Sequence, residues 1–210
     1  MFNRYTFPCD QIFKLEINNL TFPFNLTFKP AGQSVDRANF RGPGVYILSY
    51  SNQVIYVGSY KSTNTVDVRY IRWARHLETI TLRGKRIGFG KKIYDNIAKE
   101  LHPDFQVVFT RELLADRLID TGVVTSINRI SFALEQWNDF SKFDDNLLGN
   151  FSFEYFKFDE QNDTNRQRVC QIENELIMKI NPRCNRQYSD RRTLCYEKSC
   201  QEAEQLFNLP

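Results

Sequence analysis

Two short β-rich runs placed almost end to end are the feature that most constrains the fold of this chain. Residues 45–50 and 54–57 are rich in valine, isoleucine and tyrosine, which are enriched in strands, and only three residues separate the runs. A connection this short predicts a β-hairpin. Gly44 and Gly58 flank the pair, and a residue without a Cβ permits a tight turn or the close approach of another backbone.

A helix is expected soon after the hairpin. In residues 68–77 the apolar side chains recur at helical spacing. Arg72 and His76 are four residues apart, so they share a second face of this helix.

A second amphipathic helix is expected at residues 169–180, where apolar positions again repeat at helical spacing. Pro182 ends this helix, because proline cannot continue the backbone hydrogen-bond ladder. The helix carries two candidate acids, Glu173 and Glu175, and Asn185 lies 12 residues beyond the first of them.

These segments together form an ordered pattern: Gly44-Val45-Tyr46, Tyr56-Val57-Gly58, Arg72 with His76, then Glu173 and Asn185. The set resembles the GIY-YIG nuclease family, discontinuously over roughly residues 44–186. The interval from Glu173 to Asn185 is similar to that between the family's metal-binding glutamate and its closing asparagine, which favours Glu173 over its rival Glu175.

The resemblance implies a catalytic set of six residues: Tyr46, Tyr56, Arg72, His76, Glu173 and Asn185. Glu173 is the implied metal ligand, because one carboxylate with phosphate oxygens and water is a normal Mg²⁺ environment; Mn²⁺ is a substitute. The fork of donors on Arg72 suits the charge that develops on phosphate. Tyr46 is implied as the base-side tyrosine, with His76 as a candidate relay or orienting partner and Asn185 as a group that orders the site.

The expected fold is α/β in the α+β sense, a small mixed, largely antiparallel sheet flanked by helices. We expect a third strand at residues 151–158, with 105–109 as the alternative. The expected organisation is an N-terminal extension of short strands and loops at 1–40, a nuclease domain at 41–190 with an insertion at about 82–148, and a weakly helical tail at 191–210. Further helices are expected at about 91–101 and at 125–137.

Basic and amide side chains suggest where DNA binds. In residues 83–92 five of ten side chains are basic, which is typical of phosphate contacts. The inserted region is expected to read base edges, although its apolar positions would equally suit a dimer interface. The candidate DNA-binding residues are Arg83, Lys85, Arg86, Lys91, Lys92, Arg111, Asn128, Arg129 and Gln136.

Composition sets broader limits. With 41% hydrophobic residues and a net charge of +3, the chain is not expected to be disordered. It has no apolar run of roughly 18–20 residues, so no membrane span is expected. The N-terminus lacks a secretory signal pattern and the five cysteines are expected as free thiols, so the predicted location is the cytoplasm. The resemblance implies a prokaryotic or phage protein.

The function expected from the resemblance is a Mg²⁺-dependent, sequence-specific endonuclease for double-stranded DNA, of the type II restriction kind. Cutting both strands with one site per chain suggests a homodimer. Two alternatives stay open: another GIY-YIG nuclease, from a phage, a mobile element or a structure-specific repair system, and a DNA-binding module that has lost catalysis.

Overall fold

The computed structural model describes residues 1–31, 36–61, 66–85, 87–90, 108–110, 112–114, 117–119, 125–143, 146–160, 162–187, 189 and 191–209. The fold is mixed α+β, as predicted. The chain forms two compact units. The sheet unit comprises residues 1–14, 29–74 and 144–210, and the second unit comprises residues 15–28 and 75–143.

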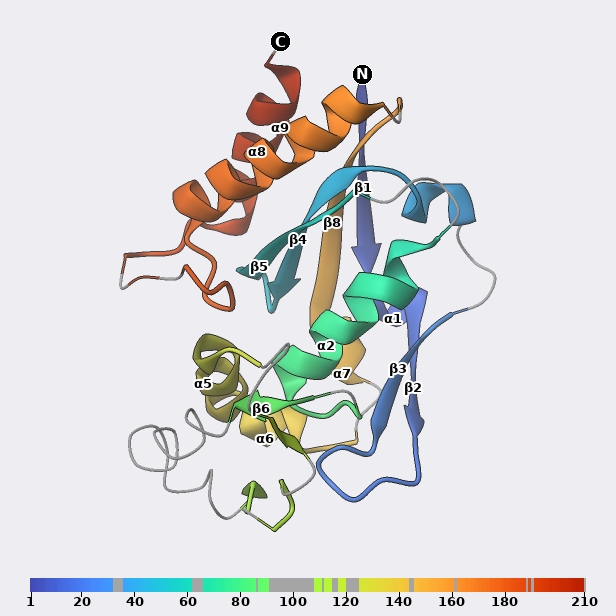
Figure 1. Cartoon of the computed structure of the whole chain (residues 1–210), viewed down its shortest axis with the longest axis vertical. Helices are drawn as coiled ribbons and strands as arrows, with labels where there is room; N and C mark the ends of the chain where they lie inside the picture. Colours follow the sequence, from blue (N-terminus) through green and yellow to red (C-terminus); the bar gives the residue numbers. More distant parts are fainter. Residues whose placement is uncertain are drawn as a thin grey trace. The chain divides into compact units, whose positions relative to one another are not determined.

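The sheet unit is built on a four-stranded antiparallel sheet (Figure 1). Its strands in spatial order are β1 (Phe2–Pro8), β8 (Phe151–Phe158), β4 (Gly44–Tyr50) and β5 (Gln53–Tyr60). The predicted hairpin is confirmed as β4 and β5. Ser51 and Asn52 join them with φ angles of 47° and 62°, the positive values that a two-residue primed turn requires.

The predicted third strand at 151–158 is confirmed as β8, which lies between β1 and β4. Most of the alternative strand, 105–107, lies outside the described residues, as does the predicted helix at 91–101. β1 belongs to the main sheet, because its register runs along the whole of β8, from Phe2 opposite Phe158 to Pro8 opposite Ser152. The first strand is therefore an edge strand of the sheet rather than part of a separate extension.

The remaining described elements are α1 (Cys9–Ile12), β2 (Phe13–Ile17), β3 (Leu26–Pro30), the 3-10 turn η1 (Arg37–Phe40), the π-helical turn η2 (Arg69–Trp73), α2 (Ala74–Thr81), β6 (Phe89–Gly90), β7 (Leu118–Ile119), α5 (Ile127–Glu135), α6 (Trp137–Phe140), α7 (Asn146–Gly149), α8 (Asp163–Ile180) and α9 (Tyr196–Asn208). The predicted helices at 68–77, 125–137 and 169–180 are therefore confirmed, with shifted boundaries.

One face of the sheet is covered by α8 and α9 (Figure 1). Apolar side chains of β4, β5 and β8 join those of both helices in one buried cluster. α8 begins at Asp163, six residues before the predicted start, because the Asn162 side chain caps it by accepting a hydrogen bond from the backbone N–H of Asn165. α9 buries its apolar face, so the C-terminal segment is part of the core and the expectation of a weakly helical tail is wrong.

The other face of the sheet packs on Trp73, the last residue of η2. Its ring is fully buried and stacks on Phe153 with the ring centroids 4.2 Å apart. Tyr46 and Phe40 meet the same indole edge to face. This packing fixes the end of η2 against the sheet, one residue after Arg72.

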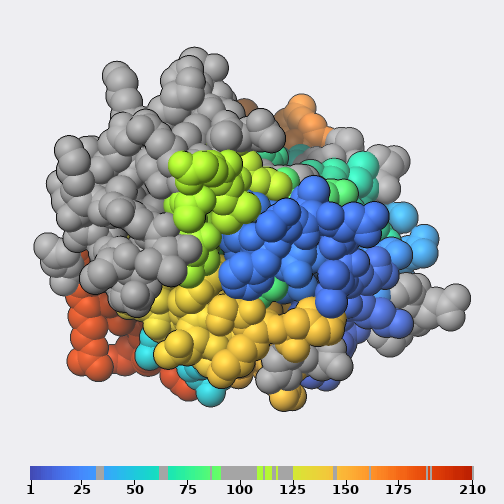
Figure 2. Space-filling model, turned by 90° about the horizontal axis from the view of Figure 1, so that it is seen from below, coloured from blue at the N-terminus to red at the C-terminus, as the bar shows by residue number. Residues whose placement is uncertain are grey.

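In the second unit, Arg83 is a structural residue, and the prediction that it contacts phosphate is wrong. It is only 1% exposed and donates hydrogen bonds to the carbonyl oxygens of Pro23 and Phe140 and to the side-chain oxygen of Asn25. Burial lowers the pKa of Arg83 to about 10, which leaves the guanidinium charged at neutral pH. In Figure 2, atoms of the blue N-terminal part of the chain lie against atoms of the yellow part, the two parts to which Arg83 donates.

The unit boundaries differ from the expected domain boundaries. Residues 15–28 belong with the inserted region, and residues 191–209 belong with the sheet. Among the described residues, no helix combines the length and the apolar character needed to cross a membrane. All five cysteines are free thiols.

Replacement of Arg83 tests its structural role. Arg83→Met should lower the free energy of unfolding by about 3 kcal/mol, because it leaves buried oxygen acceptors without a donor. The matched control is Lys85→Met, since Lys85 is exposed and should tolerate the same change. Urea unfolding of both variants measures the difference, and equal midpoints would contradict the assignment.

Candidate active site

The tyrosines of the Gly-Val-Tyr and Tyr-Val-Gly segments come together beside a glycine. Tyr46 on β4 is directly opposite Gly58 on β5. A Cβ atom on Gly58 would lie 2.6 Å from the Tyr46 hydroxyl oxygen and 2.7 Å from a ring carbon of Tyr56. The missing side chain therefore provides the space in which Tyr46 crosses the neighbouring strand, and the two tyrosine ring centroids are 6.3 Å apart.

The glycine at the other end of the pattern has a different role. A Cβ atom on Gly44 would lie 2.4 Å from the carbonyl oxygen of Phe156 and 2.7 Å from the ring of Tyr155. Gly44 therefore allows β8 to pack closely beside β4. The predicted close approach of another backbone is confirmed at Gly44, whereas the atoms that come close to Gly58 belong to side chains.

Arg72 belongs to a short segment that is held by a buried residue before it and a buried residue after it. Trp73 is buried after it, and Arg69 is buried before it. The Arg69 guanidinium pairs with Asp67, with Nη2 2.6 Å from Oδ2, and it lies 3.9 Å from the ring centroid of Phe40. Between these anchors the residues 70–72 are exposed.

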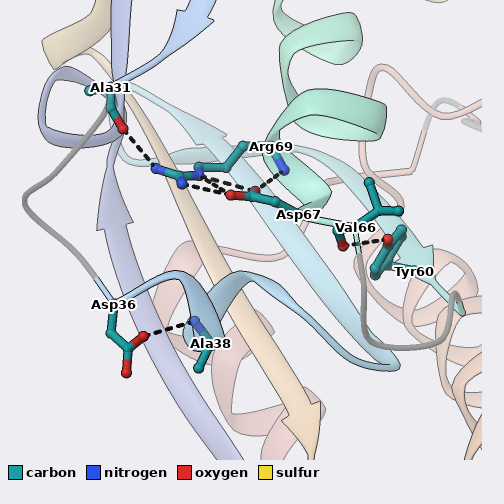
Figure 3. A network of polar contacts seen from close by, with 7 residues as sticks. All are labelled: Ala31, Asp36, Ala38, Tyr60, Val66, Asp67 and Arg69. Carbon is teal, nitrogen blue, oxygen red and sulfur yellow. Dashed lines mark hydrogen bonds and ion pairs between the residues drawn. The ribbon is translucent and has the colours of Figure 1, made fainter.

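The segment before η2 is tied down by further polar contacts, drawn in Figure 3. The Asp67 carboxylate also accepts from the backbone N–H of Arg69, and Arg69 donates to the carbonyl oxygen of Ala31. The Tyr60 hydroxyl at the end of β5 donates to the carbonyl oxygen of Val66 at 2.7 Å. These contacts fix the position at which the chain enters η2, and therefore the position of the Arg72 backbone.

Glu173 reaches the end of β5 from α8. The Ser59 hydroxyl donates a hydrogen bond to its Oε2. Glu173 is partly buried, whereas Glu175 is exposed. Ser59 was not predicted as a site residue; the available signal was a hydroxyl directly after Gly58 on a strand expected to carry the site.

These side chains surround one cleft of about 480 Å³, a size suited to a small ligand or one unit of a polymer. Its lining residues all belong to the sheet unit: Tyr46, Tyr56, Ser59, Tyr60, Lys61, Ile71, Arg72 and Glu173. Four of the six predicted catalytic residues are thus brought together, although up to 127 positions separate them in the sequence. Tyr60, Lys61 and Ile71 are further lining residues that sequence reasoning missed.

Asn185 supports this cleft through the backbone of β5. Its side chain is buried, accepts from the Val57 N–H at 2.9 Å and donates to the Val57 carbonyl oxygen at 2.8 Å. The N–H of Cys184 donates to the carbonyl oxygen of Ile55. Because β5 is an edge strand, these bonds supply the partners that a further strand would provide, and they hold the backbone between Tyr56 and Gly58.

His76 is one helical turn after Arg72, in the part of α2 that belongs to the second unit. Its Nδ1 lies 3.3 Å from Nη2 of Arg129, which also donates to Thr79. Asn128 and Gln136 are partly buried and Lys85 is exposed. Arg86, Lys91, Lys92 and Arg111 lie outside the described residues.

The donor set in the cleft fits a hard divalent cation held by one protein carboxylate. Glu173 supplies the carboxylate, and the Ser59 hydroxyl occupies one of its oxygens. Mg²⁺ commonly takes one or two carboxylates and keeps several waters. Within the part of the chain that the structure describes, no three His, Cys, Asp or Glu side chains cluster as a metal site.

Comparison with known proteins found no matching family model, curated protein or solved structure. What the cleft can do therefore follows from its own residues: a carboxylate, an arginine, a lysine and two tyrosine hydroxyls within one concave site. This combination suits a bound phosphate group and proton transfer beside it.

The space at Gly58 gives a direct test of the site's packing. Gly58→Ala should lower the free energy of unfolding by about 1–3 kcal/mol, because the new methyl group displaces Tyr46 or Tyr56. A Cβ atom at Gly149 would meet no atom within 4 Å, so Gly149→Ala should be neutral or slightly stabilising. Urea unfolding compares the two, and equal tolerance of both changes would refute the account of Gly58.

The two hydrogen bonds of Asn185 can be tested by replacing its side-chain NH2 group with an oxygen atom. Asn185→Asp should destabilise the protein by about 2 kcal/mol at pH 7, since the carboxylate cannot donate to the Val57 carbonyl oxygen. The loss should shrink below pH about 4, where a protonated carboxyl group can donate again. Asn52→Asp is the control, because this exposed turn residue has φ of 62° and Asp tolerates that conformation. A loss that does not depend on pH would contradict the two-bond arrangement.

Proposed function

We propose that this chain is a Mg²⁺-dependent endonuclease of the GIY-YIG kind that hydrolyses phosphodiester bonds in double-stranded DNA. The observation that carries the proposal is the joint lining of one cleft by Tyr46, Tyr56, Arg72 and Glu173. These residues come from three separate parts of the chain: the β4–β5 hairpin, η2 and α8.

Arg72 binds and stabilises the phosphate in this proposal. Its exposed guanidinium stands at the cleft on a segment held by the buried residues Arg69 and Trp73. A positioned arginine forms two parallel hydrogen bonds to phosphate oxygens and offsets the charge that grows in the transition state. Lys61 supplies a second positive charge at the same cleft.

The two tyrosine hydroxyls take part in proton transfer from the attacking water molecule. Tyr46 is the base-side residue, held by packing on Trp73 and Phe153. Tyr56 lies beside it across the hairpin. Each hydroxyl gives up its own proton as it accepts one, so the two hydroxyls orient the attacking water and relay its proton to the surrounding solvent.

Glu173 holds the metal ion. When bound there, Mg²⁺ or Mn²⁺ supplies Lewis-acid stabilisation of the phosphate and of the leaving oxygen. Ser59 donates to one oxygen of Glu173 and so keeps the carboxylate at the end of β5. The burial of Glu173 relative to the exposed Glu175 supports this choice between the two acids.

The biological setting belongs to the same proposal. The type II restriction kind of activity requires cutting of both strands, and one cleft per chain favours a homodimer acting on a palindromic sequence in a prokaryotic or phage-infected cytoplasm. Base reading is assigned to the second unit, through Asn128, Arg129 and Gln136, with Lys85 as a phosphate contact.

Incubation of plasmid DNA with the protein and Mg²⁺ tests the function. Discrete fragments are the expected result, a smear or a preference for branched DNA would favour another nuclease of the same chemistry, and intact DNA would contradict the proposal. Chelation by EDTA should stop cleavage and Mn²⁺ should restore it.

Glu173→Gln should reduce cleavage by about a thousand-fold or more while DNA binding survives, because the amide keeps the size but loses the anionic ligand. Glu175→Gln on the same helix is the matched control and should cut normally. Cleavage assays under saturating DNA and filter binding with Ca²⁺ separate the two effects. Loss of cutting in the control variant alone would move the site to Glu175.

A further inference from the structure

The loop between α8 and α9, residues 181–195, is strongly basic. It carries four arginines against a single aspartate: Arg183, Arg186, Arg191 and Arg192 against Asp190. We call it the basic loop. A run of charged residues is usually only a solvated surface. The hydrogen bonds that fix this loop therefore decide whether it is suited to binding.

The base of the loop is fixed by Asn181. Its φ of 57° turns the chain at the end of α8, and its side chain bonds to the backbone of Ser189 and to the carbonyl oxygen of Arg191. The Thr193 hydroxyl donates to the Asn181 carbonyl oxygen at 2.9 Å. The two ends of the basic loop are therefore closed on each other by several hydrogen bonds.

The middle of the loop is fixed to the sheet. Asn185 pairs with both backbone groups of Val57, and Val57 directly precedes Gly58 and follows Tyr56, which lines the cleft. Figure 1 shows the loop descending from α8 toward β5. Arg186 is the residue after Asn185, and consecutive Cα atoms are about 3.8 Å apart, so this arginine begins close to the cleft.

The arginines of the loop differ in their contacts: Arg183 is half-buried, and the other three are exposed. Arg191 donates to Ser189 Oγ and to the carbonyl oxygen of Met178, so it helps to hold the loop. Arg186 and Arg192 are exposed to solvent. Arg186 and Arg192 thus follow residues whose positions are held by hydrogen bonds, Asn185 and Arg191, which reduces the entropy lost on binding.

We propose that the basic loop binds the phosphates of the DNA strand that flank the phosphate in the cleft, with Arg186 and Arg192 as the contacts. The inference rests on the proposed function, because it takes DNA as the substrate. A duplex carries one negative charge for about every 1.7 Å of its axis, so DNA with one phosphate in the cleft brings others past the edge of β5. An arginine fork matches phosphate oxygens. These contacts carry no sequence information.

The test is the salt dependence of DNA binding. The double variant Arg186→Gln, Arg192→Gln should weaken binding to all duplex sequences alike. Its slope of log affinity against log salt should fall by about 1.8, or about 0.9 for each lost phosphate contact. Fluorescence anisotropy with labelled duplexes and Ca²⁺ in place of Mg²⁺ measures the slope without cleavage.

Arg37→Gln is the matched control, because Arg37 is an exposed arginine of η1 in the same unit, and its slope should equal that of the wild type. An unchanged slope in the double variant would overturn the proposal, and so would an equal fall in the control, which would reflect net charge alone. Thermal unfolding checks that each variant is folded. Failure of the proposed function is seen separately, as wild-type protein that leaves plasmid DNA intact with Mg²⁺.

Discussion

The close approach of Tyr46 to β5 is the constraint on which the site depends. The aromatic ring can cross its partner strand only where that strand has no side chain, and Gly58 is the residue directly opposite. The same ring is packed from behind by Trp73, which ends the segment that presents Arg72. One buried contact therefore links the hairpin, the π-helical turn and the cleft.

The cleft lies at the edge strand β5, where side chains from both faces of the sheet line it. Successive residues of a strand point to opposite faces, so Tyr56 lies on the side of Tyr46 while Ser59 reaches α8 and its Glu173. An interior strand would keep these two sets apart. At the edge, Asn185 supplies the missing backbone partners of Val57.

Much of this arrangement could be predicted from sequence, and the failures have physical causes. The hairpin and the α8 helix have strong local signals, in β-rich runs and in apolar spacing. The pairing of β1 with β8 is a contact across about 150 residues, which no local pattern reveals. Basic residues occupy five of the ten positions 83–92, Arg83 included, which predicts a surface location, yet the burial of Arg83 is set by carbonyl oxygens from distant segments. Ser59 was missed because a single serine forms no sequence pattern that would identify it as a site residue.

The central claim is that one phosphodiester group and one divalent cation meet in the cleft of the sheet unit. The most direct measurement is a crystal structure of the protein with Mn²⁺ and a duplex that cannot be cleaved, with Mn²⁺ located by its anomalous scattering. The account predicts a peak against the Glu173 carboxylate and a DNA phosphate held by Arg72 beside Tyr46 and Tyr56. Metal and phosphate bound elsewhere, with this cleft empty, would contradict it.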